Sequence, residues 1–328
     1  MREIVASANA NVALAKYWGK RDDSLNLPYT GSLSVTLAGL TTTARASFLG
    51  HLPEDRVLLN GQEADSVEAP RFRSFMDLIR SRAAIAARAE ISITSNFPVA
   101  AGLASSASTF AALAVAATHA AGLSLSSEDL SVLARRGSGS AARSIHGGYV
   151  EWLAGEASDG SDSVATQVAP PEHWPLGVVV AVTDEGRKRV GSREGMAHAV
   201  KTSPFFPLWL ESHDADLEAI RHGIQERNLQ IVGETAERNC LKMHAVAMAA
   251  RPSILYWTPA TVAVIHRVVD LRREGIQAYF TIDAGPQVKV LCLPQYRAAV
   301  AAEIGCVAGV QRVLLSEPGT GAQVVEGA

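Results

Sequence analysis

The sequence predicts a two-domain α+β protein with a strand-rich first part and a helix-rich later part. Short segments rich in β-branched residues alternate with turns over the first hundred residues. From Gly195 onward, long helical patterns alternate with only two strand candidates. A chain of 328 residues is also long enough for two domains of ordinary size. We place the boundary near Asp184, which gives domains at residues 1–184 and 185–328.

The first part is expected to form a sheet. Its strand signals combine β-branched residues with alternating apolar positions, as in Ile91 and Ile93, and the turn dipeptide Asn60-Gly61 ends one of them. The segments are 3–6, 32–37, 41–48, 56–59 and 89–95. An alanine-rich helix is predicted at 104–121, and a second helix at 127–136 carries Leu130, Leu133 and Ala134 on one face.

The later part is expected to alternate helices with a few strands. Helical patterns cover residues 208–231, 231–250 and 258–274, and apolar strand candidates lie at 176–182, 278–282 and 288–293. The small, polar and acidic stretch 154–163 is typical of an exposed loop within a domain.

Charge and cysteine content exclude several classes of protein. The 30 Lys and Arg residues against 33 Asp and Glu residues give a net charge of -3, so no nucleic acid or membrane partner is expected. Cys240, Cys292 and Cys306 are too few for a disulfide framework, which favours a reducing compartment. The first residues lack the apolar core of a signal peptide, and the apolar stretch 110–123 is shorter than a membrane span. We therefore expect a cytoplasmic protein.

The segment 98–108 predicts a phosphate-binding loop around Gly102. Its small residues let the backbone approach a ligand closely, its serines supply hydroxyl donors, and it lies between a strand and the alanine-rich helix. The N-H groups at the start of that helix would point at the loop. A tight turn with serine caps is the alternative interpretation.

Cations gather in three further segments. Residues 11–21 place Lys16, Lys20 and Arg21 beside two aromatic residues, and residues 188–196 are cationic where a helix should begin. Residues 136–143 combine two serine hydroxyls with a guanidinium, which suits a carboxylate or a phosphate. They match the dinucleotide pattern only formally, because they follow a helix where that pattern requires a strand. Solvated basic turns and surface ion pairs are the alternatives.

Asp283 is the candidate general base. It ends a strand rich in aromatic and β-branched residues and precedes the turn at Gly285-Pro286. Turn chemistry alone would also explain an aspartate there. The nine histidines show no metal-ligand spacing, so the sequence predicts no metal site built from protein side chains.

Taken together, these segments resemble the GHMP kinase superfamily and, within it, the diphosphomevalonate decarboxylases. The likeness covers nearly the whole chain, with 98–107 resembling the phosphate loop of the superfamily. The matches specific to the decarboxylases are 13–21, 32–37, 135–144, 193–196, 236–248 and 279–286. The resemblance implies a two-domain GHMP kinase-like fold, with a first domain like the second domain of ribosomal protein S5 and a ferredoxin-like second domain.

The resemblance also implies an ATP-dependent decarboxylation. ATP would phosphorylate the tertiary C3 hydroxyl of (R)-5-diphosphomevalonate, and loss of phosphate and carbon dioxide would give isopentenyl diphosphate. Mg²⁺ would be held mainly by phosphate oxygens. Relatives are often homodimers, so a homodimer is expected.

Residue roles follow from the matched motifs. The catalytic residues would be Asp283 near the C3 hydroxyl, Lys16 to keep that carboxylate ionised, and Arg143 to bind the C1 carboxylate. Substrate binding is expected from Tyr17, Lys20, Arg71, Ser138, Ser140, Ser192, Arg193 and Met196. ATP binding is expected from Asn96, Gly102, Ser105, Ser106, Ser108 and Lys188.

Two departures leave the choice of substrate open. Tyr29-Thr30-Gly31-Ser32 stands where relatives usually have Asn-Ser-Ser before Leu-Ser-Val-Thr-Leu, and Gly191 stands where a serine is common. These losses would allow a phosphomevalonate decarboxylase or a mevalonate 3-kinase as alternatives. Retention of Arg143 and Asp283 argues against a kinase alone. A non-catalytic nucleotide or metabolite sensor is a remote alternative, because a sensor would not need Asp283.

Overall fold

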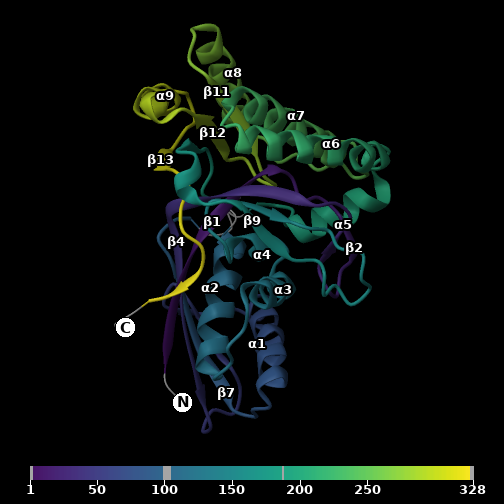
Figure 1. Cartoon of the computed structure of the whole chain (residues 1–328), viewed down its shortest axis with the longest axis vertical. Coiled ribbons are helices and arrows are strands. Elements are labelled where there is room, and N and C mark those ends of the chain that lie inside the picture. Colours follow the sequence, from purple (N-terminus) through teal and green to yellow (C-terminus); the bar gives the residue numbers. More distant parts are fainter. Residues whose placement is uncertain (1–2, 99–104, 187, 326–328) are drawn as a thin grey trace.

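A computed structural model describes residues 3–98, 105–186 and 188–325, and it has two α+β layers, one above the other in Figure 1. The lower layer is built on an eight-stranded sheet and the upper layer on a four-stranded antiparallel sheet. The mixed α+β class predicted from the sequence is confirmed.

The sheets draw their strands from separate parts of the chain. The first sheet contains β1 (Ile4–Ala15), β4 (Ser32–Leu49), β5 (Arg56–Leu59), β6 (Gln62–Glu63), β7 (Arg88–Ser95), β8 (Tyr149–Trp152), β9 (Ala165–Ala169) and β14 (Gln323–Val324). The second sheet has the order β11 (Ala278–Ile282), β12 (Val288–Cys292), β10 (Gly177–Val182) and β13 (Arg312–Ser316). A small hairpin consists of β2 (Lys20–Asp22) and β3 (Leu27–Pro28).

The helices flank these sheets. They are α1 (Ala69–Ala83), α2 (Ser105–Ala120), α3 (Ser127–Gly137), α4 (Ala141–Ser144), α5 (Ser192–Thr202), α6 (Phe206–Gln225), α7 (Leu229–Met248), α8 (Pro259–Arg273) and α9 (Arg297–Gly305). Short 3-10 turns lie at Pro171–His173 and Pro294–Tyr296. Among the described residues, no helix is both long and apolar enough to cross a bilayer.

The long strand β4 organises the first sheet. It pairs with β1 on one edge, while its first half pairs with β8 and its second half with β7. The sequence predicted two strands here, at 32–37 and 41–48, but the structure has one. Gly39 adopts a φ of 79°, and the pairing with β1 skips from Thr36 to Thr41, so the chain bulges without leaving the sheet.

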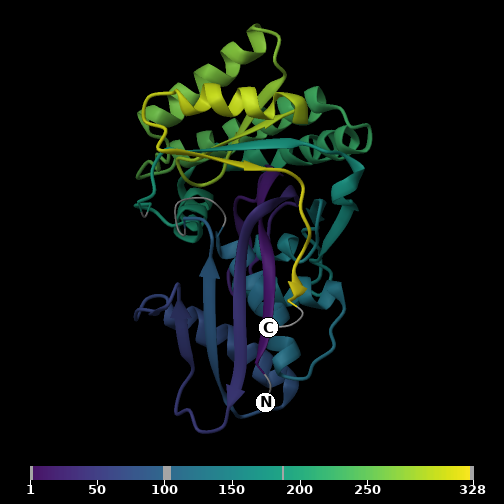
Figure 2. The same ribbon diagram turned by 90° about the vertical axis from the view of Figure 1, so that its left-hand side faces the viewer.

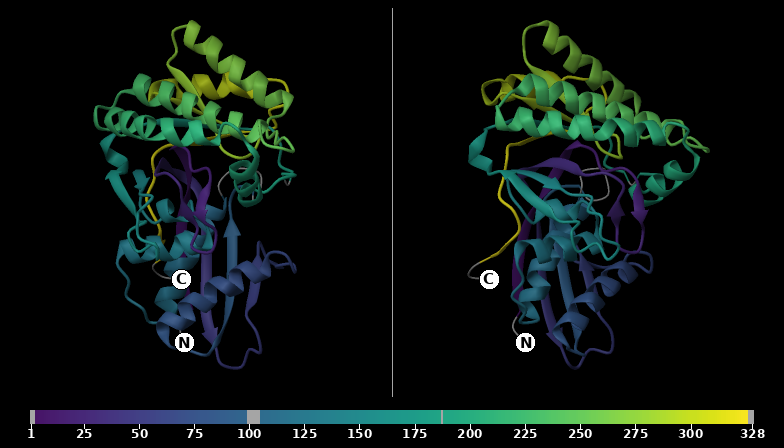
Figure 3. Two further views of the ribbon diagram at one scale, coloured as in Figure 1. Left: turned by 90° about the vertical axis from the view of Figure 1, so that its right-hand side faces the viewer. Right: turned by 45° about the vertical axis from the view of Figure 1, so that its right-hand side comes forward.

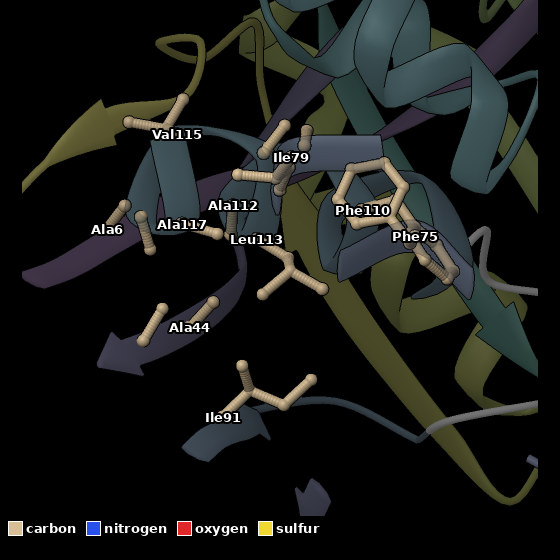
Figure 4. Close-up of a cluster of buried hydrophobic side chains, with 14 of the residues drawn as sticks. Ala6, Ala44, Phe75, Ile79, Ile91, Phe110, Ala112, Leu113, Val115 and Ala117 are labelled. Carbon is tan, nitrogen blue, oxygen red and sulfur yellow. The ribbon is translucent and has the colours of Figure 1, made fainter. Parts of the chain in front are cut away.

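The core of the lower layer lies between α2 and the first sheet, as Figure 4 shows. Phe110 and Leu113 of α2 are buried there with Phe75 of α1. Small side chains on the facing strands, such as Ala6 and Ala44, let the helix approach the sheet closely. Because α2 is buried nearly all round, its sequence shows little amphipathic pattern.

A second apolar cluster joins the two layers. It contains Val12 of β1, Val35 of β4, Val180 of β10, Ile220 of α6 and Val232 of α7, all fully buried. The cluster is continuous across the junction, so the layers are packed against each other as parts of one core. This packing sets the relative position of groups that the two layers contribute to a common cavity.

The chain passes from the lower layer to the upper layer before β10 and returns to the lower layer before β14. Strand β10 lies before residue 184 yet pairs within the second sheet. Strand β14, near the end of the chain, returns to pair with β1, and Figure 2 shows this yellow segment running down along the lower layer. The division of the chain at residue 184 stays a prediction.

Several elements escaped the sequence analysis. The helix α1 begins at Ala69 without a side-chain cap from Glu68, but Pro70 in its first turn and the buried residues Phe72, Phe75, Met76 and Ile79 at helical spacing are signals that were overlooked. Strands β13 and β14 and helix α9 were also not predicted. By contrast, the strand predicted at 278–282 coincides with β11, and the helix predicted at 104–121 corresponds to α2.

The close packing of α7 on β11 gives a stability prediction. A Cβ atom at Gly233 would overlap the Tyr279 ring, so Gly233→Ala should lower the free energy of unfolding by about 1–3 kcal/mol. The matched control is Gly305→Ala in α9, where the nearest atom to a new Cβ is 3.6 Å away. Chemical denaturation should show no loss for the control, and equal losses in the two variants would contradict the packing argument.

Candidate active site

A cavity of about 620 Å³ lies where the two layers meet. Its walls come from the end of β1, the β2–β3 hairpin and the first turns of α2 and α5, and from α4 and the turn after β11. Helix α5 and strand β2 lie between the layers in Figure 1, and Figure 3 turns that side toward the viewer.

The cavity brings together most of the residues predicted from the sequence. All three predicted catalytic residues line it, as do all eight predicted substrate-binding residues and three of those assigned to ATP. These are Lys16, Tyr17, Lys20, Arg71, Ser105, Ser106, Ser138, Ser140, Arg143, Lys188, Ser192, Arg193, Met196 and Asp283.

Of the other three residues assigned to ATP, Asn96 and Ser108 do not line it. Asn96 donates to the Gly39 carbonyl at 2.9 Å and accepts from the Thr41 amide, so its side chain ties a turn together. Ser108 is buried against Thr42, with 2.7 Å between the hydroxyl oxygens. Gly102 lies outside the described residues.

Asp283 lies directly after β11 and is held between two ammonium groups. Its Oδ1 accepts from Lys16 Nζ at 2.7 Å, and its Oδ2 accepts from Lys289 Nζ at 3.0 Å. Burial disfavours the carboxylate, but the charges of Lys16 and Lys289 outweigh that effect and hold the pKa of Asp283 well below its usual range. The side chain is still 22% exposed, so an ionised carboxylate faces the cavity.

Lys289 was missed in the sequence analysis. It lies in β12 between Val288 and Val290 and is 2% exposed. A lone lysine inside an apolar strand needs a buried counter-charge, which is the signal that would have connected it with the aspartate at the end of the neighbouring strand.

Arg143 in α4 is a buried cation whose hydrogen-bond partners among the described residues are all neutral. Its guanidinium donates to Ser34 Oγ at 3.0 Å, to Asn11 Oδ1 at 3.1 Å and to Ser32 Oγ. Burial lowers its pKa to about 10, so the group stays charged at neutral pH. Three of its five N-H donors are used among the described residues, which leaves two for an anion in the cavity. Asn11, which orients it, was not singled out from the sequence.

A row of hydroxyl groups crosses the cavity wall. Ser106 in the first turn of α2 lies 3.1 Å from the Ser138 hydroxyl, which in turn lies 3.5 Å from that of Ser140. The row starts in the first described turn of α2. Hydroxyls and a helix start at one place suit the oxygens of a phosphate.

Two further lysines of the cavity, Lys20 and Lys188, have lowered pKa values. Burial, with the charge of Arg193, lowers the pKa of Lys20 to about 8. Burial also lowers the pKa of Lys188 to about 8, although Asp283 opposes the shift. Lys188 donates to Ser192 Oγ at 2.6 Å and to the Ala284 carbonyl at 2.7 Å, which places it beside the turn that carries Asp283. Both ammonium groups would be better stabilised by a bound anion.

Thr30-Gly31 and Gly191, where this sequence departs from the usual motif of relatives, lie in different surroundings. Thr30 and Gly31 are buried and do not line the cavity. A Cβ on Gly31 would lie 3.0 Å from Leu217 of α6, so this glycine lets the chain pass close to that helix. Gly191 does line the cavity, and a Cβ there would meet nothing within 4 Å.

The two-layer α+β fold and a cavity that combines several cations, a row of hydroxyls and one ionised carboxylate define an enzyme that acts on phosphorylated anions. The family comparisons narrow this class. Residues 8–165 match the diphosphomevalonate decarboxylase-like N-terminal domain, and residues 178–324 match the mevalonate 5-diphosphate decarboxylase C-terminal domain. The chain therefore belongs to the diphosphomevalonate decarboxylase family, and the resemblance seen in the sequence is confirmed.

Individual relatives agree with this assignment. The diphosphomevalonate decarboxylase of Candida albicans is 37% identical over 356 residues, with 98% of each chain covered. The mevalonate diphosphate decarboxylase structure from Staphylococcus aureus has a TM-score of 0.93 at 37% identity and covers 99% of this chain and 98% of that one. The structure of MDDEF in complex with MVAPP, AMPPCP and magnesium has a TM-score of 0.92 at 37% identity, with 98% of each chain covered.

The perturbed lysines predict a pH-dependent anion affinity. Lys20 and Lys188 lose their protons as the pH rises through about 8, so positive charge in the cavity falls. Between about pH 7 and about pH 9, the dissociation constant of sulfate should rise about tenfold for each lysine whose charge it needs. Sulfate keeps its own charge over this range, so calorimetric titration reports on the protein alone. Lys20→Arg should flatten the dependence, and a constant affinity in the unmodified protein would contradict the assignment.

Proposed function

We propose that this protein converts (R)-5-diphosphomevalonate and ATP to isopentenyl diphosphate, ADP, phosphate and carbon dioxide. The observation that carries the proposal is the Lys16–Asp283–Lys289 arrangement, in a cavity shared with Arg143 and the serine hydroxyls. An ionised carboxylate can accept a hydrogen bond from a substrate hydroxyl. A guanidinium with two unused N-H donors can bind a substrate carboxylate.

In the first step, Asp283 orients the tertiary C3 hydroxyl toward the terminal phosphoryl group of ATP. The carboxylate accepts a hydrogen bond from that hydroxyl while Lys16 and Lys289 hold it in place. Its low pKa makes Asp283 a weak base. A weak base suffices, because phosphoryl transfer passes through a loose transition state and the hydroxyl proton is lost only late, when the Asp283 carboxylate accepts it.

In the second step, the C3-O bond breaks and its electron pair leaves with phosphate. The electrons of the C1-C2 bond then form the C2=C3 double bond, and C1 departs as carbon dioxide. Phosphorylation must come first, because hydroxide is a poor leaving group and phosphate is a good one. Arg143 holds the C1 carboxylate through its two remaining N-H donors until the C1-C2 bond breaks.

The nucleotide lies against the start of α2. Ser105 and Ser106, the first N-H groups of α2 and Lys188 surround its phosphates. Mg²⁺ supplies charge neutralisation on the phosphate oxygens. Among the described residues, no group of three or more His, Cys, Asp or Glu side chains is placed to hold a metal ion.

The diphosphate tail of the substrate lies near the start of α5 and the β2–β3 hairpin. Lys20 and Arg193 supply charge there, and Ser192 supplies a hydroxyl. The Tyr17 hydroxyl is buried without a partner among the described residues, and burial raises its pKa, so it remains a donor for a phosphate oxygen. Arg71 and Met196 complete this wall, with Ser138 and Ser140 opposite the mevalonate chain.

A cytoplasmic homodimer is part of the proposal. Phe205, Leu208 and Leu241 are exposed apolar residues on and beside the neighbouring helices α6 and α7, and they support an interface between two copies of the chain. The balanced charge and the three free cysteines support a reducing aqueous compartment.

The substrate assignment is tested by carbon dioxide release. With ATP and Mg²⁺ present, kcat/KM should be at least about tenfold higher for 5-diphosphomevalonate than for 5-phosphomevalonate. The reason is that the second phosphate gains contacts with Lys20 and Arg193, each worth about 1.5–3 kcal/mol when charge-assisted. Faster turnover of the monophosphate would contradict the assignment. It would indicate that Gly191, which stands where a serine is common, changes the choice of substrate.

The role of Asp283 is tested by Asp283→Asn. This change removes the carboxylate charge while keeping the shape of the side chain, so kcat should fall by about 10²–10⁴-fold. The dissociation constant of the nucleotide should stay within about twofold, which also reports on correct folding. The control Asp159→Asn changes an aspartate in an exposed loop and should leave kcat unaltered. Equal rates in the two variants would place the acceptor elsewhere.

A further inference from the structure

Side chains of α7 form hydrogen bonds with backbone groups of β11. Strand β11 is an edge strand of the second sheet, with β12 as its neighbour. Glu237 Oε1 accepts from the Phe280 amide at 2.9 Å, and Cys240 Sγ accepts from the Ile282 amide at 3.2 Å. The Ile282 carbonyl accepts from His244 Nε2 at 3.3 Å and from Cys240 Sγ at 3.4 Å. Spacings of three and four residues put these side chains on one helix face.

The last of these contacts reach the residue that immediately precedes Asp283. Both backbone groups of Ile282 are held, its amide by Cys240 and its carbonyl by Cys240 and His244. A displacement of Ile282 would move the Asp283 carboxylate away from Lys16 Nζ, which is 2.7 Å from it. The contacts therefore bear on the geometry of the ion pair.

The same helix also holds the other member of the pair. Asn239 Oδ1 accepts from the backbone amide of Lys16 at 2.8 Å, and Asn239 is fully buried. Its Nδ2 donates to Asp216 Oδ2 at 2.9 Å, and Lys242 Nζ lies 2.5 Å from the same oxygen. The carboxylate of Asp216 requires a donor, so the amide oxygen of Asn239 must face Lys16.

We propose that Asn239, Cys240 and His244 of α7 are positioning residues that set the Lys16–Asp283 pair for phosphoryl transfer. Asn239 acts on the Lys16 side, and Cys240 and His244 act on the Asp283 side. The inference deepens the proposed function and rests on it. None of these three side chains lines the cavity, so their effect passes through the two backbone segments that they hold.

The chemistry of the three side chains suits a fixed support. Burial, with the charge of Lys16, lowers the pKa of His244 to about 3, so its imidazole is neutral and donates from Nε2 to the carbonyl. Burial raises the pKa of the Cys240 thiol to about 11, so the thiol keeps its proton. Neither contact changes charge around neutral pH.

The test compares His244→Phe and Cys240→Ala with matched controls. Both variants should lower kcat about tenfold, with KM for both substrates within about twofold, because a misplaced reacting group slows chemistry without weakening binding. His244→Gln offers an amide donor at a similar reach and should recover most of the rate. Cys292→Ala removes another buried thiol, which contacts the Gly177 carbonyl and not the Asp283 segment, and should leave kcat unchanged.

A purely structural role would give a different pattern. A lower melting temperature with unchanged kcat in His244→Phe, or an equal loss of kcat in Cys292→Ala, would overturn the inference. A rise of KM with kcat intact would also overturn it, because positioning residues act on the chemical step.

A second measurement separates this inference from the proposed function. Nitrogen NMR of the unliganded protein follows proton exchange at the Lys16 ammonium, which the ion pair with Asp283 slows. Exchange should become at least about tenfold faster in His244→Phe and stay slow in Cys292→Ala. That result would support the positioning role even if the unmodified protein failed to release carbon dioxide. Unchanged exchange in His244→Phe and Cys240→Ala would refute it.

Discussion

One carboxylate held between two buried ammonium groups is the interaction on which the rest of this structure depends. Lys16 follows β1 of the first sheet, whereas Asp283 follows β11 and Lys289 lies in β12 of the second sheet, so the charged cluster spans the junction of the layers. Burying each of these ions alone would cost several kcal/mol. The cluster is stable only when the layers pack in one orientation, and the apolar residues shared between β1, β4, β10 and α6 provide that orientation.

The cavity attracts anions because of the cations around it and not because of the net charge of the whole protein. The chain is slightly acidic overall, yet Lys20, Arg143, Lys188 and Arg193 surround one cavity. The cavity walls remove much of the water that would otherwise solvate these cations, which is why the pKa values of Lys20 and Lys188 are lowered. Binding of a phosphorylated substrate relieves that penalty. The burial that lowers the pKa values of these lysines therefore also strengthens their binding of an anion.

The sequence predicted the parts of the site that local patterns mark. Asp283 could be found because it ends a strand before a glycine-proline turn, and Arg143 because it follows a loop of small hydroxyl residues. Arg71 was assigned only through the resemblance, since nothing around it predicts a ligand. Lys289 and Asn11 were missed because each looks like an ordinary strand residue until its partner is known. Asn96 and Ser108 were assigned to ATP, but their side chains are engaged in a turn and in packing, which residue type alone does not reveal.

By itself, the sequence determined the α+β class, the order of most strands and helices, the family and the small set of charged and hydroxyl residues from which a site could be built. These follow from local periodicity, turn chemistry and short motifs, all of which act over a few residues. Only the tertiary structure decided that Lys289 shares Asp283 with Lys16, that Asn11 orients Arg143, and that side chains of α7 form hydrogen bonds with backbone groups of β11. Those contacts join residues from different strands and helices. They exist only because two layers, with strands from distant parts of the chain, pack around one apolar core.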